Sequence, residues 1–231
     1  MHKKAELILI IIVLIGLIGA GRKLVDLVSS GKVKTGEDTV IIDCGHGGAD
    51  PGKVGINNAL EKDLNLQIGK LVKKRLKKEG IKVLMTREKD EMLAGEEFDN
   101  KKVQDMKARV EYINKTAPAL AVSIHQNSYH EENVRGAQVF YYSHSKEGEQ
   151  AADMMQAALL SLDMENTREE KPNDSYYLLK KTEVPTIIVE CGFLSNYEEA
   201  QLLISKEYQE KVADAITEGI KTYLASKTIG K

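Results

Sequence analysis

Residues Val40–Gly52 read V-I-I-D-C-G-H-G-G-A-D-P-G, and this stretch decides how the rest of the chain is interpreted. The short β-branched run Thr39–Cys44 predicts a buried strand, which ends in a glycine-dense turn carrying His46. Four glycines in this window are more than a simple turn needs. Because glycine lets the backbone bend sharply, we expect the turn to point His46 into a site at the end of the strand.

Strand and helix patterns alternate after this turn. Apolar residues at helical spacing predict helices, and short β-branched runs predict strands. The predicted helices are Ala59–Glu79, Val103–Asn114, Glu147–Leu162 and Tyr208–Leu224, and the later strands are Ile81–Met85, Leu120–Ile124, Ala137–Tyr142 and Thr186–Glu190. This alternation predicts an α/β domain with a mostly parallel or mixed central sheet and helices on both faces.

The residues before this domain are of two kinds. Leu7–Ala20 is an uncharged apolar run of 14 residues, short of the roughly 17–25 that span a membrane and inside the ~7–15 of a secretory segment. An uncleaved signal-anchor helix within residues 1–28 is favoured over a cleaved signal. The polar, glycine-punctuated residues 29–38 predict a linker, so the domain boundaries are placed at 39–226, with a short tail at 227–231.

Composition excludes some classes of function. A net charge of −2, with no basic stripe interleaved with aromatic residues, argues against a nucleic-acid partner. The two cysteines, Cys44 and Cys191, are too few for a disulfide framework or a cysteine-rich zinc site. Each lies beside a candidate site residue, so a Cys–His nucleophile is conceivable, but a small buried hydrophobic role fits the strand ends better.

Side chains that can bind a metal or transfer a proton lie where several predicted strands end and where the first long helix begins. His46, His125 and Glu190 follow or close strands, and Glu61 opens the first long helix. Ligands of an α/β sheet gather at the carboxyl ends of its strands. Two imidazoles and one carboxylate with an open fourth position are the ligand set of a catalytic zinc site. Spacing alone leaves open that the loop histidines are surface residues and that Glu61 is an ordinary helix-start charge.

Five motifs make the site specific. The segments D-C-G-H-G-G-x-D-P-G, L-E-K-D-L-N-L, T-R, S-I-H-x-N-S and V-E-C-G-F-L-S-N follow one another in this order. Together they resemble the zinc-dependent N-acetylmuramoyl-L-alanine amidases of the Amidase_3 type, from about Thr39 to Leu224. The resemblance implies one zinc ion held by His46, Glu61 and His125. It also implies that Glu190 is the catalytic acid and base.

The resemblance further implies the reaction and the substrate. Such enzymes cut the amide between N-acetylmuramic acid and the L-alanine of the peptidoglycan stem peptide. The short N-terminal segment and the bare catalytic domain resemble the family's germination-specific spore-cortex amidases, which initiate muramic-δ-lactam formation. A vegetative autolytic or cell-separation amidase is the alternative within this chemistry. A carboxypeptidase-like zinc peptidase and a noncatalytic peptidoglycan-binding protein are the alternatives outside it.

Two further residues are assigned to substrate binding or to the support of the ligands. Arg87 could orient an acidic part of the peptide, since guanidinium pairs well with carboxylates, or could form an internal ion pair. Asn127 could donate to the substrate or orient His125. The partners expected are peptidoglycan and a membrane through the N-terminal helix, and the need for an accessory protein stays open. We expect the protein to be exported, either anchored facing the wall or secreted, and to act at the forespore cortex.

Overall fold

The computed structural model describes residues 36–95, 97 and 99–229. The predicted signal-anchor at 1–28 and most of the predicted linker lie outside the described residues. Within residues 36–229, no helix has the length and apolar character needed to cross a membrane. The first strand begins at Gly36 and the last helix ends at Ile229, so regular structure extends three residues beyond each boundary predicted for the domain.

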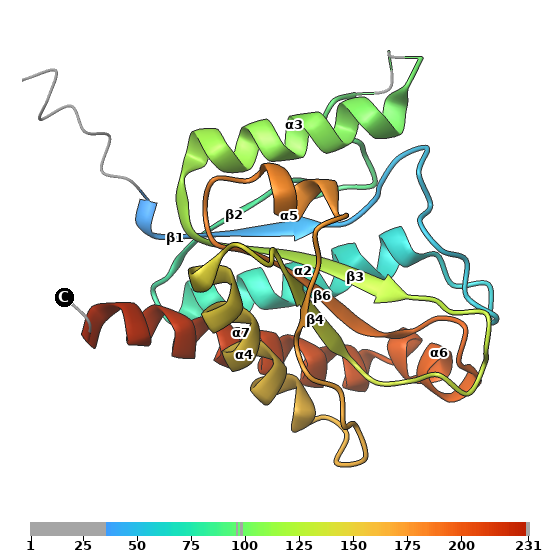
Figure 1. Ribbon diagram of the computed structural model, residues 1–231. Helices are drawn as coiled ribbons and strands as arrows, with labels where there is room; N and C mark the ends of the chain where they lie inside the picture. Colours follow the sequence, from blue (N-terminus) through green and yellow to red (C-terminus); the bar gives the residue numbers. More distant parts are fainter. Residues whose placement is uncertain (1–35, 96, 98, 230–231) are drawn as a thin grey trace, which may run out of the picture. The chain divides into compact units, whose positions relative to one another are not determined.

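The centre of the described unit is a sheet of six strands in the order β2-β1-β3-β6-β4-β5 (Figure 1). The strands are β1 (Gly36–Cys44), β2 (Lys82–Met85), β3 (Pro118–Asn127), β4 (Gln138–Tyr141), β5 (Lys171–Pro172) and β6 (Thr186–Phe193). Neighbouring strands are parallel except for β4, which runs antiparallel to β6. The predicted mostly parallel, mixed α/β sheet is therefore confirmed.

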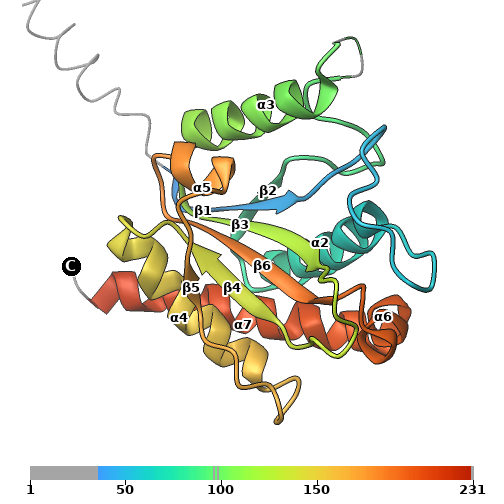
Figure 2. The same cartoon turned by 45° about the vertical axis from the view of Figure 1, so that its right-hand side comes forward.

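Helices cover both faces of this sheet (Figure 2). They are α2 (Glu61–Lys78), α3 (Lys101–Thr116), α4 (Lys146–Leu160), α5 (Tyr177–Lys181), α6 (Tyr197–Ile204) and α7 (Lys206–Ile229). Helices α2, α4, α6 and α7 lie on one face, and α3 and α5 lie on the other. The four predicted helices match α2, α3, α4 and α7, whereas β5, α5 and α6 were not predicted.

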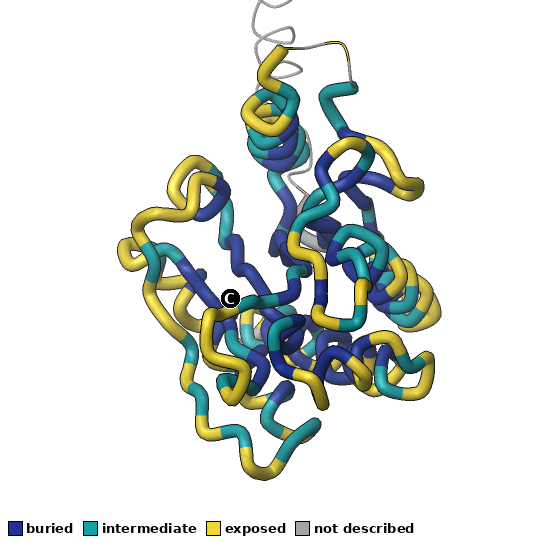
Figure 3. Tube along the Cα trace, turned by 90° about the vertical axis from the view of Figure 1, so that its right-hand side faces the viewer, coloured by how far each residue is buried: buried dark blue, intermediate teal, exposed yellow. Residues whose placement is uncertain are grey.

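The alternation of side chains along β1 divides the apolar core between the two faces. Val40, Ile42 and Cys44 join the larger buried cluster, which packs against α2, α4 and α7. Ile41 joins a smaller buried cluster with Ile113 of α3 and the two leucines of α5. Figure 3 shows the buried segments gathered toward the centre of the unit and the exposed ones at its periphery. Burial of apolar side chains on both faces holds the sheet rigid between its helices.

The same alternation decides which face the polar strand residues occupy. In β3, Leu120, Val122 and Ile124 belong to the larger cluster, so His125 projects toward the α3 and α5 face. Glu190 pairs with His125 in the register of β6 against β3 and projects to the same face. The carboxyl ends of β1, β3 and β6 thus bring their polar side chains to one edge of the sheet.

Candidate metal centre

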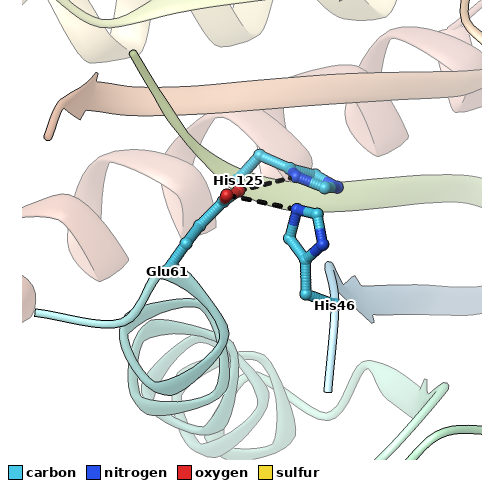
Figure 4. Close-up of side chains that lie close together, drawn as sticks. All are labelled: His46, Glu61 and His125. Carbon is cyan, nitrogen blue, oxygen red and sulfur yellow. Dashed lines mark hydrogen bonds and ion pairs between the residues drawn. The ribbon is translucent and has the colours of Figure 1, made fainter. Parts of the chain in front are cut away.

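Three predicted ligands meet at this edge (Figure 4). His46 follows β1, Glu61 opens α2 and His125 lies near the end of β3. His46 Nε2 is 3.1 Å from Glu61 Oε2, and His125 Nδ1 is 2.9 Å from Glu61 Oε1. One ligand atom from each of the three lies within 4.8 Å of the other two. Two imidazole nitrogens and one carboxylate converging in this way fit a divalent cation such as zinc.

Glu61 is the buried centre of the cluster, with a 2% exposed side chain. Its Oε2 accepts the backbone N–H of Lys53 at 2.8 Å, and its Oε1 accepts that of Gln126 at 3.1 Å. Burial alone would raise the pKa of Glu61, but the two imidazoles outweigh it and hold the pKa well below its usual range. A permanently ionised carboxylate in this position suits a metal ligand.

Both ring nitrogens of His46 contact a carboxylate, Nδ1 that of Asp50 and Nε2 that of Glu61. Its backbone adopts φ = 61°, a left-handed conformation that costs energy for a residue other than glycine. Its Nδ1 is 2.8 Å from Asp50 Oδ2, so the opposite nitrogen, Nε2, is the one turned toward Glu61. A carboxylate on the second imidazole nitrogen fixes the ring orientation and tautomer of a metal-binding histidine. Gly52 is required nearby, because a Cβ there would lie 2.5 Å from Glu61 Oε2.

His125 packs against the backbone of the glycine-rich turn. A Cβ built on Gly45 would lie 2.3 Å from both Cε1 and Nε2 of the His125 ring, so only glycine leaves room for the imidazole. Nε2 therefore faces Gly45 while Nδ1 faces Glu61. Burial opposes the charged ring, but Glu61 raises the pKa of His125 to about 9. The cluster attracts positive charge, which a bound cation supplies in place of the proton.

Glu190 stands beside the cluster without belonging to it. It is 7% exposed, and its Oε2 is buried with no hydrogen-bond partner among the described residues. Burial raises the pKa of Glu190 to about 7, an effect that His125 partly opposes and Glu61 reinforces. A buried carboxyl with a pKa near neutrality and one free oxygen is suited to accept and return a proton.

The guanidinium of Arg87 is held by backbone carbonyls beside the metal centre. Arg87 is 3% exposed and donates to the carbonyls of Cys44, Gly45, Lys62 and Lys89 at 2.7–3.1 Å. These bonds tie the glycine-rich turn to α2. Every guanidinium nitrogen of Arg87 donates to backbone oxygen, and Arg87 is not among the residues that line the cavity at the site. The substrate contact predicted for it stays a prediction.

Asn127 lies at the end of β3, two residues after His125. Its side-chain Oδ1 accepts the backbone N–H of Ser128 at 2.8 Å, and its carbonyl accepts that of Leu194 at 2.8 Å. The structure therefore places it as the last residue of β3, paired with Phe193 of β6. Its predicted contact with substrate or with His125 is also left as a prediction.

A buried ion-pair network that the sequence did not reveal fixes the backbone at His46. Arg109 of α3 donates to Asp43 Oδ1 at 2.6 Å and to Asp105 Oδ2 at 2.7 Å. It also donates to the carbonyl of His46 at 2.7 Å. Burial by itself would raise the pKa of Asp43, but Arg109, with Ser123 and Thr86, holds it below the ordinary value. The spacing of Asp105 and Arg109, four residues apart on one helix, was the available signal.

The cysteines point away from the metal centre. Both belong to the core cluster on the α2 face, and a Cβ on Gly69 of α2 would lie 2.4 Å from Cys44 Sγ. Burial raises the pKa of the Cys44 thiol to about 12 and that of Cys191 still further. The interpretation of both as buried hydrophobic residues is confirmed, and a Cys–His nucleophile is excluded.

A cavity of about 300 Å³ opens onto His46, His125 and Glu190. Its walls come from α3, through Lys102 and Met106, and from the start of α5, through Tyr176 and Tyr177. Because α5 was not predicted, the sequence did not assign the tyrosines to the site. The cavity leaves room for a substrate group beside the candidate ligands.

An α/β sheet that gathers two imidazoles and a carboxylate at its carboxyl edge, beside a buried glutamate with an unpartnered oxygen, is the arrangement of a metal-dependent hydrolase. Residues 40–222 match the family described as N-acetylmuramoyl-L-alanine amidase, Amidase_3. The chain belongs to this family of amidases, which act on peptidoglycan.

Individual relatives agree with this assignment. The chain is 39% identical over 191 residues to the germination-specific N-acetylmuramoyl-L-alanine amidase of Bacillus subtilis, covering 81% of this chain and 80% of that protein. It resembles the CwlD amidase of Clostridioides difficile, solved in complex with the GerS lipoprotein, with a TM-score of 0.79 and 38% identity over 82% of this chain and 99% of that one. The amidase AmiC2 of Nostoc punctiforme gives a TM-score of 0.71 and 33% identity, covering 83% and 99% of the two chains.

Proposed function

We propose that this amidase uses one zinc ion, held by His46, Glu61 and His125, to hydrolyse the bond between N-acetylmuramic acid and the L-alanine of the stem peptide. The observation that carries the proposal is the convergence of these three ligands beside the unpartnered carboxyl oxygen of Glu190. When bound, zinc polarises a carbonyl oxygen and makes a water molecule more acidic.

Glu190 carries the proton in this reaction. Its carboxylate accepts a proton from the attacking water and returns it to the nitrogen of L-alanine as the amide bond breaks. Burial raises the pKa of Glu190 and a bound cation lowers it, and the group needs both influences because it must give up the proton as readily as it takes it. Asp50 holds the His46 ring in place through Nδ1 during the reaction.

Product analysis of the zinc-loaded full chain tests the proposal. Incubation with muropeptides should release stem peptides with a free N-terminal L-alanine, detected by mass spectrometry, and simple peptides of the same sequence should stay intact. His46→Ala and His125→Ala should lose zinc and activity together, because two ligands bind the ion weakly. Cleavage of simple peptides, or full zinc occupancy in either variant, would contradict the assignment.

The substrate we propose is spore-cortex peptidoglycan, with the cleavage initiating muramic-δ-lactam formation. The 39% identity to a germination-specific amidase supports this choice. Digestion of cortex and vegetative sacculi in parallel, followed by a peptidoglycan deacetylase, should yield muramic-δ-lactam from the cortex sample. Equal activity on vegetative walls, with no lactam formed, would favour the autolytic role instead.

An accessory protein is proposed as a second partner, since the similar CwlD amidase was solved with a lipoprotein. The quantity to compare is zinc content of the chain with and without a co-expressed lipoprotein from the same genome. Full zinc occupancy and full turnover by the isolated chain would show that no partner is needed.

The site of action we propose lies outside the cytoplasm, where the substrate of this family is found, with residues 1–28 anchoring the domain to the membrane. Fractionation of cells should recover the intact chain with the membrane and leave the domain accessible to added protease only after the wall is removed. Recovery of the unprocessed chain from the cytosol would contradict both export and anchoring.

A further inference from the structure

Lys102 is the exposed cation at the metal centre. Of the described residues that line the cavity at the ligands, two carry a permanent positive charge, Lys102 and Arg109. Arg109 is 1% exposed and its guanidinium is taken up by two aspartates and two carbonyls. The side chain of Lys102 is 70% exposed and makes one ion pair, 2.7 Å from Nζ to Asp50 Oδ1. Of these two described residues, Lys102 is therefore the one placed to exchange its partner for a ligand.

Lys102 lies at the boundary between the cavity at the metal centre and two neighbouring hollows. It lines the cavity at the ligands, a hollow beside Ala49 and Met92, and an apolar hollow formed with Met106 and Tyr177. Its ammonium is separated from the His46 ring by a single carboxylate, that of Asp50. One or two extended residues of a bound peptide, ~3.3–3.6 Å each, would reach from the His46 ring to the Lys102 ammonium.

We propose that Lys102 binds the free carboxylate of the stem-peptide residue that follows L-alanine, and so selects acidic stem peptides over amidated ones. This rests on the amidase function proposed above. The stem peptide is anionic beyond the scissile bond, and Met106 and Tyr177 beside Lys102 offer apolar contacts to the rest of the bound peptide residue. The present pair with Asp50 is an exposed lysine contact of the kind that contributes little to stability, so the ammonium can leave it readily.

Asp50 remains satisfied when Lys102 turns to the substrate. Its Oδ2 keeps the contact of 2.8 Å with His46 Nδ1, and its Oδ1 keeps the backbone N–H of Gly52 at 3.3 Å. The ligand geometry therefore does not depend on which carboxylate Lys102 holds. This separation allows substrate recognition to be tested apart from metal binding.

The test compares two muramoyl-peptides that differ only in the second residue, which carries a free carboxylate in one and a carboxamide in the other. We expect the zinc-loaded full chain to have a kcat/KM about tenfold higher for the carboxylate form, the low end for a hydrogen bond to a charged group. Lys102→Met should bring the ratio of the two kcat/KM values close to one. Lys102→Arg should keep the preference, and so should Lys107→Met, which removes an exposed lysine of the same helix outside the cavity lining.

Three results would overturn the inference. Equal kcat/KM for the two substrates in the wild-type chain would show that the carboxylate is not recognised. A Lys102→Met variant that loses activity on both substrates while keeping their ratio would show that Lys102 acts only through Asp50, and zinc content would report that effect. Cleavage of neither substrate by the zinc-loaded chain would instead refute the amidase proposal itself, and this inference with it.

Discussion

Glu190 and His125 occupy paired positions on the adjacent parallel strands β6 and β3. The register places the carboxyl of Glu190 directly beside a candidate metal ligand, on the face covered by α3 and α5. A slip of one residue in either strand would turn one of the two side chains to the opposite face. The hydrogen bonding of the two central strands is thus what aligns the proposed base with the ligand cluster.

The first prediction concerns Asp50, which supports His46. Asp50→Asn removes the charge that orients the His46 ring through Nδ1. We expect zinc affinity to fall about 10–100-fold, the usual effect of losing such a partner. Competition with a chromophoric chelator measures the change. Asp90→Asn is the control, because Asp90 contacts the same loop through the N–H of Gly48 without touching a ligand. Equal affinities for zinc in the wild type and Asp50→Asn would show that the His46 ring is oriented by other contacts.

The second prediction concerns the contact between Gly45 and the His125 ring. In Gly45→Ala the new methyl group would lie 2.3 Å from ring atoms, so the imidazole must move. A shift of about 1 Å at a reacting centre can cost on the order of 10²-fold in rate, and we expect turnover to fall by about that factor.

Gly192→Ala is the matched control for this substitution. Gly192 lies in β6, and a Cβ there would meet nothing closer than 3.4 Å. Turnover and metal content should be measured together in both variants. If Gly45→Ala retained full activity, His125 would have room that the structure does not show.

The third prediction concerns acid stability through the Asp43–Arg109 ion pair. The pKa of Asp43 is lower in the folded chain than its ordinary value of 3.8, so the ionised carboxylate favours the folded state. This contribution is complete above about pH 4 and is lost as the pH falls through the lower pKa of the folded state. Asp43→Asn should reduce the free energy of unfolding by about 3–5 kcal/mol at neutral pH, because the buried Arg109 loses a partner.

Denaturant unfolding of the two proteins between neutral pH and pH 3 measures this difference. It should shrink as the pH falls below about 4, as protonation removes the charge in the wild type. Asp214→Asn, which removes one of the two exposed carboxylate partners of Arg75, should change stability by about 0–1 kcal/mol. A difference between the wild type and Asp43→Asn that stayed constant with pH would show that the pair is not held by charge.

Much of the fold followed from periodicity in the sequence. The helices α2, α3, α4 and α7 were predictable because each repeats its apolar stripe over several turns. Helix α5 has five residues and β5 has two, too few for any period to be read. Their position depends on contacts with distant strands, and with α5 the sequence also missed the tyrosine wall of the cavity.

The site was predictable in its residue types but not in the direction of every side chain. The sequence pattern of a strand that ends in histidine does not show whether the side chain faces the cavity or the solvent. Arg87 shows the limit, since its place after β2 suggested a substrate contact while its guanidinium donates to backbone carbonyls. Lys102 shows the converse. A lysine at the start of a helix looks like ordinary surface, and only the fold brings it beside Asp50.

The last prediction separates the proposed base from the metal ligands. Glu190→Gln keeps the shape of the side chain but cannot accept a proton. We expect zinc to remain bound and kcat to fall ~10²–10⁴-fold, the usual contribution of a positioned general base, with little change in KM. Glu61→Gln is the contrasting variant. It replaces the carboxylate that both imidazoles face with a neutral amide, so zinc and activity should be lost together.

The pH profile gives this prediction a second, independent measurement. Burial raises the pKa of Glu190 to about 7, and the base works only when ionised, so wild-type activity should decline as the pH falls. A bound cation favours the ionised form of Glu190, so the acid side of the pH profile should fall at or below about pH 7. This decline of activity at acid pH should be absent in Glu190→Gln. Near-normal turnover in that variant with zinc present would refute the role of Glu190 as base, and loss of zinc from it would make Glu190 a ligand.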